Sequence, residues 1–163
     1  MTKILTKPLT LWILFGLFIL QTIGFVVIMA VWDFEVIDEM SDPEKVRAHI
    51  VELSALQKSV HAWTTATLDV AYPLTYGPLF AGLALRAFKP FFALPAFAVI
   101  PTDLAEGIVQ VMALTGLGDL LWLKAYLTPT KLALFLIAMA IAVSALGLMF
   151  LRRKQSKSPP LEE

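Results

Sequence analysis

Residues 9–32 read LTLWILFGLFILQTIGFVVIMAVW and residues 132–151 read LALFLIAMAIAVSALGLMFL, and neither stretch contains a charged residue. A helix needs roughly 20 apolar residues to cross about 30 Å of hydrocarbon. Residues 62–85 and 91–117 are nearly as apolar and carry only Asp69, Asp103 and Glu106 as charged residues. Because lipid offers backbone groups no partner, each stretch is predicted to be a helix. We therefore expect an all-α integral membrane four-helix bundle, one domain over residues 1–163.

The composition supports a membrane protein and excludes several other classes. Hydrophobic residues make up 58% of the chain and charged residues 16%, against about 45–50% and about 25% in soluble domains. Lys and Arg together number 13, as do Asp and Glu, so there is no net positive field for nucleic acid. Cysteine is absent, which excludes disulfides and thiolate chemistry. No phosphate-binding or dinucleotide fingerprint and no paired Glu-x-x-His motif occurs, so neither a cofactor nor a metal is predicted.

The positions of the charges predict the orientation. Cytoplasmic loops of membrane proteins are enriched in Lys and Arg. Seven carboxylates lie between residues 33 and 52, in the loop after the first span. We expect that loop to face outward and both termini to be cytoplasmic, in a bacterial inner (plasma) membrane. The cations that predict the cytoplasmic side are Lys3, Lys7, Arg86, Lys89, Arg152, Arg153, Lys154 and Lys157.

The loop after the first span is predicted to contain an amphipathic helix over about residues 42–60. Val46, Ile50 and Leu53 recur on one helical face. Two placements stay open: the helix rests on the bilayer surface, or it covers the outer end of the bundle as a lid over a site. His61 follows it and is expected to be solvated.

Polar residues inside the predicted spans give the candidate site. The stretch 91–117 carries an Asp, a Glu and a Gln at spacings of three and four, which is one helix face. The stretch 62–85 carries an Asp and two Tyr on one face in the same way. Both faces fall in the outer half of the membrane, so we expect them to line an acidic cavity that opens outward. The ligand-binding candidates are Asp69, Tyr72, Tyr76, Asp103, Glu106 and Gln110.

Several functions fit such a cavity. No Lys or Arg lies within a predicted span, so Asp103 and Glu106 are expected to share a proton. The cavity could bind a hydrophobic or amphipathic small molecule or a lipid, with Asp103, Glu106 and Asp69 as candidates for proton-transfer catalysis. It could also form part of a proton- or cation-coupled transport path, or the carboxyls could simply hold the helices together. Whether the protein is an enzyme stays open.

The last predicted span carries a further interaction surface. Ala140, Ser144 and Gly147 form a seam of small residues that lets another helix approach closely. The seam packs within the bundle, forms a homodimer, or holds a partner if the chain is a non-catalytic subunit or assembly factor of a membrane complex.

The two polar stretches also carry a resemblance. The pattern Asp69-x-x-Tyr72-Pro73-x-x-Tyr76-Gly77, together with Pro101-Thr102-Asp103-x-x-Glu106, resembles a family of small bacterial four-helix membrane proteins without an assigned activity. The overall layout is similar, more loosely, to the emopamil-binding-protein-like group. Members of that group bind sterol-like or amine ligands, and some isomerise sterol double bonds. That likeness implies Asp69 and Glu106 as acid and base, although the first span here lacks a carboxylate and no His lies deep in a span.

Overall fold

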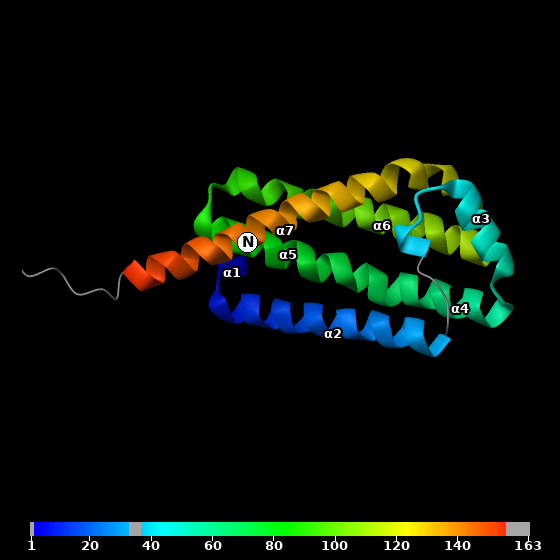
Figure 1. Ribbon diagram of the computed structural model, residues 1–163, viewed down its shortest axis with the longest axis horizontal. Coiled ribbons are helices and arrows are strands. Elements are labelled where there is room, and N and C mark those ends of the chain that lie inside the picture. The colour runs from blue at the N-terminus through cyan, green and yellow to red at the C-terminus, as the bar shows by residue number, and fades with distance from the viewer. Residues whose placement is uncertain (1, 33–36, 156–163) are drawn as a thin grey trace, which may run out of the picture.

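The computed structural model describes residues 2–32 and 37–155, and these are helical and contain no strand. Figure 1 shows the long helices lying side by side along the long axis: α2 (Pro8–Trp32), α5 (Val70–Ala87), α6 (Leu94–Thr115) and α7 (Lys124–Gln155). Among the described residues, three helical segments are long and apolar enough to cross a membrane, namely Pro8–Trp32, Pro90–Thr115 and Leu121–Lys154. They contain or closely match the predicted spans 9–32, 91–117 and 132–151. The all-α class is thus confirmed, and so is the presence of apolar helices long enough to span a membrane.

The helix α5, predicted as part of a span over residues 62–85, is not among those three segments. It packs against α2, α6 and α7, and most of its residues from Thr75 to Ala84 are buried. Interfaces between membrane helices are rich in small residues such as Gly, Ala and Thr, and α5 carries several of them where it packs against its neighbours. A Cβ on Gly77 would lie 2.6 Å from the side chain of Ile100, so glycine permits this close packing. The fourth span stays a prediction.

A widened turn lies directly before α5. Residues Thr65–Asp69 form a π-helix, η2, which continues α4 (Ala55–Thr64) into α5. Pro73 has no N–H to donate to the carbonyl of Asp69 four residues earlier, and its ring crowds that carbonyl. Helix irregularities of this kind are frequent at functional sites. Asp69 therefore lies at a break in the regular helix rather than on a continuous one.

The segment predicted as one helix over residues 42–60 is instead two helices, α3 (Pro43–Glu52) and α4. The break falls at Leu53, which has an extended backbone, and at Ser54. Ser54 and Gln57 form a capping box in which each side chain bonds the other's backbone N–H. No Gly or Pro follows Pro43 in this segment, so its sequence predicts an unbroken helix.

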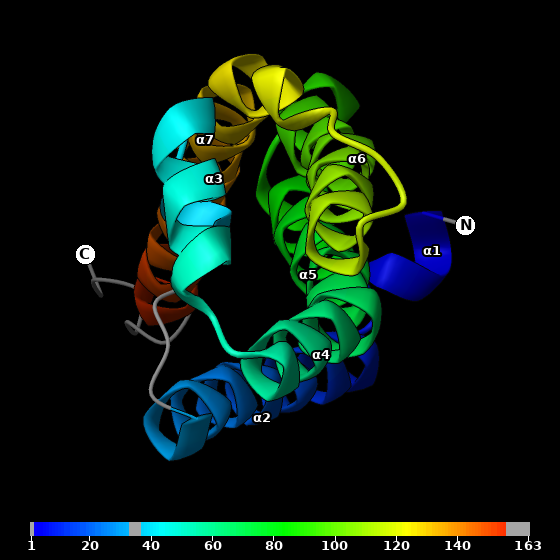
Figure 2. The same cartoon turned by 90° about the vertical axis from the view of Figure 1, so that its right-hand side faces the viewer.

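The helix α3 covers one end of the bundle. Val46 of α3 and Ile37 of η1 (Ile37–Glu39) are fully buried, in one cluster with Val109 and Leu114 of α6. Figure 2, which looks onto this end, shows α3 lying across it and α4 leading from α3 into α5. Of the two placements left open, the structure therefore has the one over the bundle. The predicted outer-loop charges at residues 33 and 35, and the cation at residue 157, lie outside the described residues.

Candidate functional site

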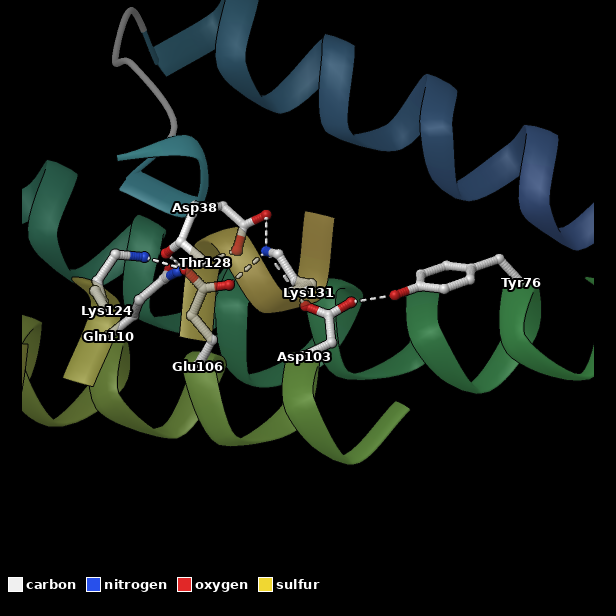
Figure 3. Close-up of polar contacts among 8 residues, drawn as sticks. All are labelled: Asp38, Tyr76, Asp103, Glu106, Gln110, Lys124, Thr128 and Lys131. Atoms are coloured by element: carbon white, nitrogen blue, oxygen red, sulfur yellow. Dashed lines mark hydrogen bonds and ion pairs between the residues drawn. The ribbon is translucent and has the colours of Figure 1, made fainter. Parts of the chain in front are cut away.

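The acidic stripe of α6 is buried as expected. Asp103 is 5% exposed, and Glu106 and Gln110 are not exposed at all. The hydroxyl of Tyr76 on α5 donates a hydrogen bond of 2.6 Å to Asp103 Oδ2. The two predicted stripes therefore meet at this point, as Figure 3 shows.

The helix α7 begins at Lys124 rather than at residue 132, and this changes the electrostatics of the site. Lys124, Thr128 and Lys131 are spaced by four and three, so they share one helix face, and that face is turned toward α6. Lys124 Nζ and Thr128 Oγ1 both donate to Glu106 Oε1. Lys131 Nζ lies 2.6 Å from Glu106 Oε2. The expectation that no Lys or Arg offsets the buried carboxylates is therefore wrong.

Lys131 joins further carboxylates to this network. Its Nζ lies 2.6 Å from Asp38 Oδ2 and 3.4 Å from Asp103 Oδ1 (Figure 3). Gln110 Nε2 donates to Asp38 Oδ1 over 3.0 Å. Burial opposes the ionisation of Asp38, but Lys131, Lys124 and Gln110 together outweigh it, so the pKa of Asp38 lies below its usual value. The segment η1 is thereby tied to both α6 and α7.

Three of these carboxylates lie close enough to suggest a metal site. Oxygens of Asp38, Asp103 and Glu106 lie within 4.8 Å of one another. The Nζ atom of Lys131 contacts all three carboxylates and supplies a fixed positive charge there. A metal ion would have to compete with this ammonium group, so we describe the cluster as a buried ion-pair network.

A cavity of about 170 Å³ adjoins the network. Its apolar wall comes from α2, and its polar wall comes from η1, α4, η2, α5 and α6. Three of the six predicted ligand-binding residues, Asp69, Tyr72 and Gln110, line it, whereas the other three belong to the ion-pair network. The lining residues are Phe25, Ile28, Met29, Asp38, His61, Thr64, Thr65, Asp69, Tyr72 and Gln110.

Asp69 faces α6 across the end of this cavity. A Cβ placed on Gly107 would lie 3.7 Å from Asp69 Oδ2, so the carboxylate packs beside the α6 residue that follows Glu106. Tyr72 faces α2 instead, where its hydroxyl lies 3.1 Å from Thr22 Oγ1 and its ring packs edge-on against Phe25. Tyr76 and Asp69 thus both face α6, whereas Tyr72 between them faces α2, and the cavity lies where α2 completes the wall.

His61 was expected to be solvated, and this expectation is wrong. Its side chain is 3% exposed and lines the cavity. Burial, reinforced by the neighbouring His49, lowers the pKa of His61 to about 4. The cavity therefore presents a neutral imidazole at neutral pH.

Asp38, Lys124, Thr128 and Lys131 are the site residues that the sequence analysis did not find. The spacing of the last three already places them on one helix face. That signal was hidden because Thr128-Pro129 resembles a helix start, which leaves Lys124 before the helix, and because the apolar span 132–151 begins after both lysines. Pro129 instead lies inside α7. Asp38 follows no periodic pattern and carries no such signal.

Comparison of the chain with known protein families, with curated proteins and with solved structures finds no match. The resemblances drawn from the two polar stretches therefore stay predictions. The function has to be argued from the geometry of the cavity and its network.

Proposed function

We propose that this protein is a four-span bacterial plasma-membrane protein with both termini in the cytoplasm. In this arrangement η2 and α5 form the fourth crossing, protected from lipid by α2, α6 and α7. Figure 1 supports the orientation, because α1 (Thr2–Leu5), the end of α5 and the end of α7 lie together at the end opposite α3. Those segments carry Lys3, Arg86 and Arg152, and positive charge favours the cytoplasmic side.

The function that the site supports best is the binding of a small amphipathic molecule in the cavity between α2, α4 and α5. The observation that carries this proposal is the two-sided lining: Phe25, Ile28 and Met29 form one wall, and polar side chains form the other. Binding sites for small molecules combine an apolar surface with a few converging polar groups in this way. Polar side chains that only held the helices together would not need a cavity beside them.

The lining also contains a buried polar atom without a protein partner. Gln110 is fully buried, and its Oε1 has no hydrogen-bond partner among the described residues. Leaving a buried acceptor unpaired costs about 1–3 kcal/mol, and a bound molecule offsets that cost. Asp69 and His61 are among the titratable groups that line the cavity, whereas Glu106 does not line it, so proton transfer would use them rather than Glu106.

The experiment compares two tryptophan variants of α2. Ile28→Trp fills the cavity from its apolar wall, whereas Val27→Trp adds the same bulk to a side chain that is 52% exposed. Each protein is purified in mild detergent, and bound molecules are identified by native mass spectrometry. We expect wild type and Val27→Trp to retain the same small molecule or lipid and Ile28→Trp to lose it.

Equal retention by Ile28→Trp would contradict the proposal. A stoichiometric partner protein without any bound small molecule would also contradict it and would favour a subunit or assembly factor instead.

A further inference from the structure

The polar atoms that the cavity offers to a ligand are largely hydrogen-bond acceptors. The Nε2 of Gln110 is held by Asp38, which leaves its unpartnered Oε1 as the free atom of that amide. No hydrogen bond or ion pair to Asp69 is found within residues 2–32 and 37–155, although its carboxylate lines the cavity. The amide oxygen accepts only, and so does the Asp69 carboxylate when it is ionised, so each then pairs with a donor on the ligand.

Two hydroxyl groups of the lining add further acceptors. Thr22 Oγ1 donates its hydrogen to the carbonyl of Phe18 over 2.8 Å, so the bond of 3.1 Å between Thr22 and Tyr72 uses the Tyr72 hydrogen. Thr64 Oγ1 likewise donates to the carbonyl of Val60 over 2.9 Å. The oxygens of Tyr72 and Thr64 then keep lone pairs without a hydrogen to offer. Asp38, Thr65 and His61 complete the polar lining.

The charges around the cavity favour a cation. The four carboxylates of the cavity and its network face two ammonium groups, those of Lys124 and Lys131, which leaves two negative charges in excess when all are ionised. Both ammonium groups are already bound to network carboxylates. Asp69 lies outside those pairs, so it is the carboxylate available to a positively charged ligand.

The apolar wall and the cavity volume limit the size and polarity of the rest of the ligand. Phe25 and Tyr72 both line the cavity, and an aromatic face attracts a cation that lies within about 6 Å of the ring centroid. The cavity of about 170 Å³ is close to the roughly 150 Å³ that accommodates benzene in an engineered apolar cavity. It therefore accepts a head group and a few carbons, not a large ring system.

We infer that the ligand of this cavity carries a primary ammonium group on a short apolar chain. Its N–H groups donate to the Asp69 carboxylate and to Gln110 Oε1, and its carbons lie against Phe25 and Ile28 of α2. This inference rests on the proposed function and names the chemical class of its ligand. The ammonium group belongs either to a free alkylamine or to the head group of an aminophospholipid of the outer leaflet.

The first experiment measures binding of three probes to wild-type protein in phosphatidylcholine nanodiscs by isothermal titration calorimetry. Butylammonium has the charge and the N–H donors, butanol has the length without the charge, and tetramethylammonium has the charge without an N–H. We expect butylammonium to bind at least tenfold more tightly than either of the others. This comparison needs no variant.

The second experiment uses Asp69→Asn, which keeps the shape and removes the charge, with Glu52→Gln as a matched control on the exposed end of α3. Asp69→Asn should weaken butylammonium binding at least tenfold, and Glu52→Gln should leave it unchanged. Repeating the titration in phosphatidylethanolamine nanodiscs separates the two sources. If phosphatidylethanolamine weakens butylammonium binding, the natural ligand is a lipid head group. If butylammonium binds equally well in both lipids, the natural ligand is a free amine.

Three results would overturn the inference. Equal binding of butanol, or of tetramethylammonium, would show that the charge or the N–H groups are not recognised, while the proposed cavity function would stand. Unchanged butylammonium binding by folded Asp69→Asn would place the cation elsewhere. Failure of all three probes, together with unchanged bound molecules in Ile28→Trp, would remove the proposed function as well.

Discussion

Replacing Glu106 by Gln should destabilise the protein because it leaves a buried ammonium group without its carboxylate. The side chains of Glu106 and Lys124 are both fully buried, and no second carboxylate lies within ion-pair distance of Lys124 in the described residues. Glu106 also lies 2.6 Å from Lys131 Nζ, where the attraction at an effective dielectric of about 20 is roughly 6 kcal/mol before desolvation. Removing one member of a buried pair costs about 3–5 kcal/mol in measured cases.

A second substitution should reverse most of that loss. Lys124→Met added to Glu106→Gln removes the orphaned charge and keeps an apolar side chain of similar length. Lys131 retains Asp38 at 2.6 Å, so the double variant leaves neither lysine without a carboxylate. We expect it to recover more than half of the lost free energy of unfolding, because replacing a whole buried ion pair by apolar groups is often neutral.

The stability of wild type, the single variant and the double variant is measured by thermal unfolding in detergent, followed through the fluorescence of the four tryptophans. A loss of 3–5 kcal/mol corresponds to a fall in Tm of about 6–20 °C for a chain of this size. Asp119→Asn is the matched control, because its ion pair with Arg47 lies on the surface and such pairs contribute little. An unchanged Tm for Glu106→Gln, or a further loss on adding Lys124→Met, would refute the buried pairing.

Three further predictions concern stability and are read from the same unfolding experiment. Burial and a neighbouring histidine lower the pKa of His61 to about 4, so the unfolded chain binds more protons between about pH 4 and 6.5. Stability should therefore rise by up to about 3 kcal/mol across that window, and less steeply in His61→Gln. Gly116 has a φ of 72°, so Gly116→Ala should cost about 1 kcal/mol. Gly147→Ala, in open space within α7, should add up to about 1 kcal/mol, and equal signs for the two glycine variants would contradict this. Tyr76→Phe removes the hydrogen bond of 2.6 Å to buried Asp103 and should lower the free energy of unfolding by about 1–3 kcal/mol.

The sequence predicts the long helices well because their apolar lengths follow from bilayer thickness. The charge-free run 9–32 predicts one long apolar helix, and α2 matches its bounds within a residue. The spacing of Asp103, Glu106 and Gln110 likewise predicts a shared face, because helical geometry fixes it. These features depend on local physics alone.

The ion-pair network could not be predicted because it depends on tertiary packing. Lys124 and Lys131 appear in the sequence as loop cations, and charge is more often found outside an apolar run than within the bundle. The contact with Glu106 becomes visible only when α7 is known to extend past Pro129. The break at Ser54 is comparable, since a capping box can end one helix and begin another without any Gly or Pro.

The accessibility of the cavity tests the central claim most directly. The chain has no cysteine, so Thr64→Cys introduces a single thiol into the cavity lining, and Ala142→Cys places one at a core position that is 2% exposed. The measurement is the rate at which 2-aminoethyl methanethiosulfonate, added from outside, modifies each thiol. We predict that Thr64→Cys reacts at least tenfold faster than Ala142→Cys and is slowed when Ile28→Trp fills the cavity. Equal rates for the two thiols would contradict an outward-opening cavity.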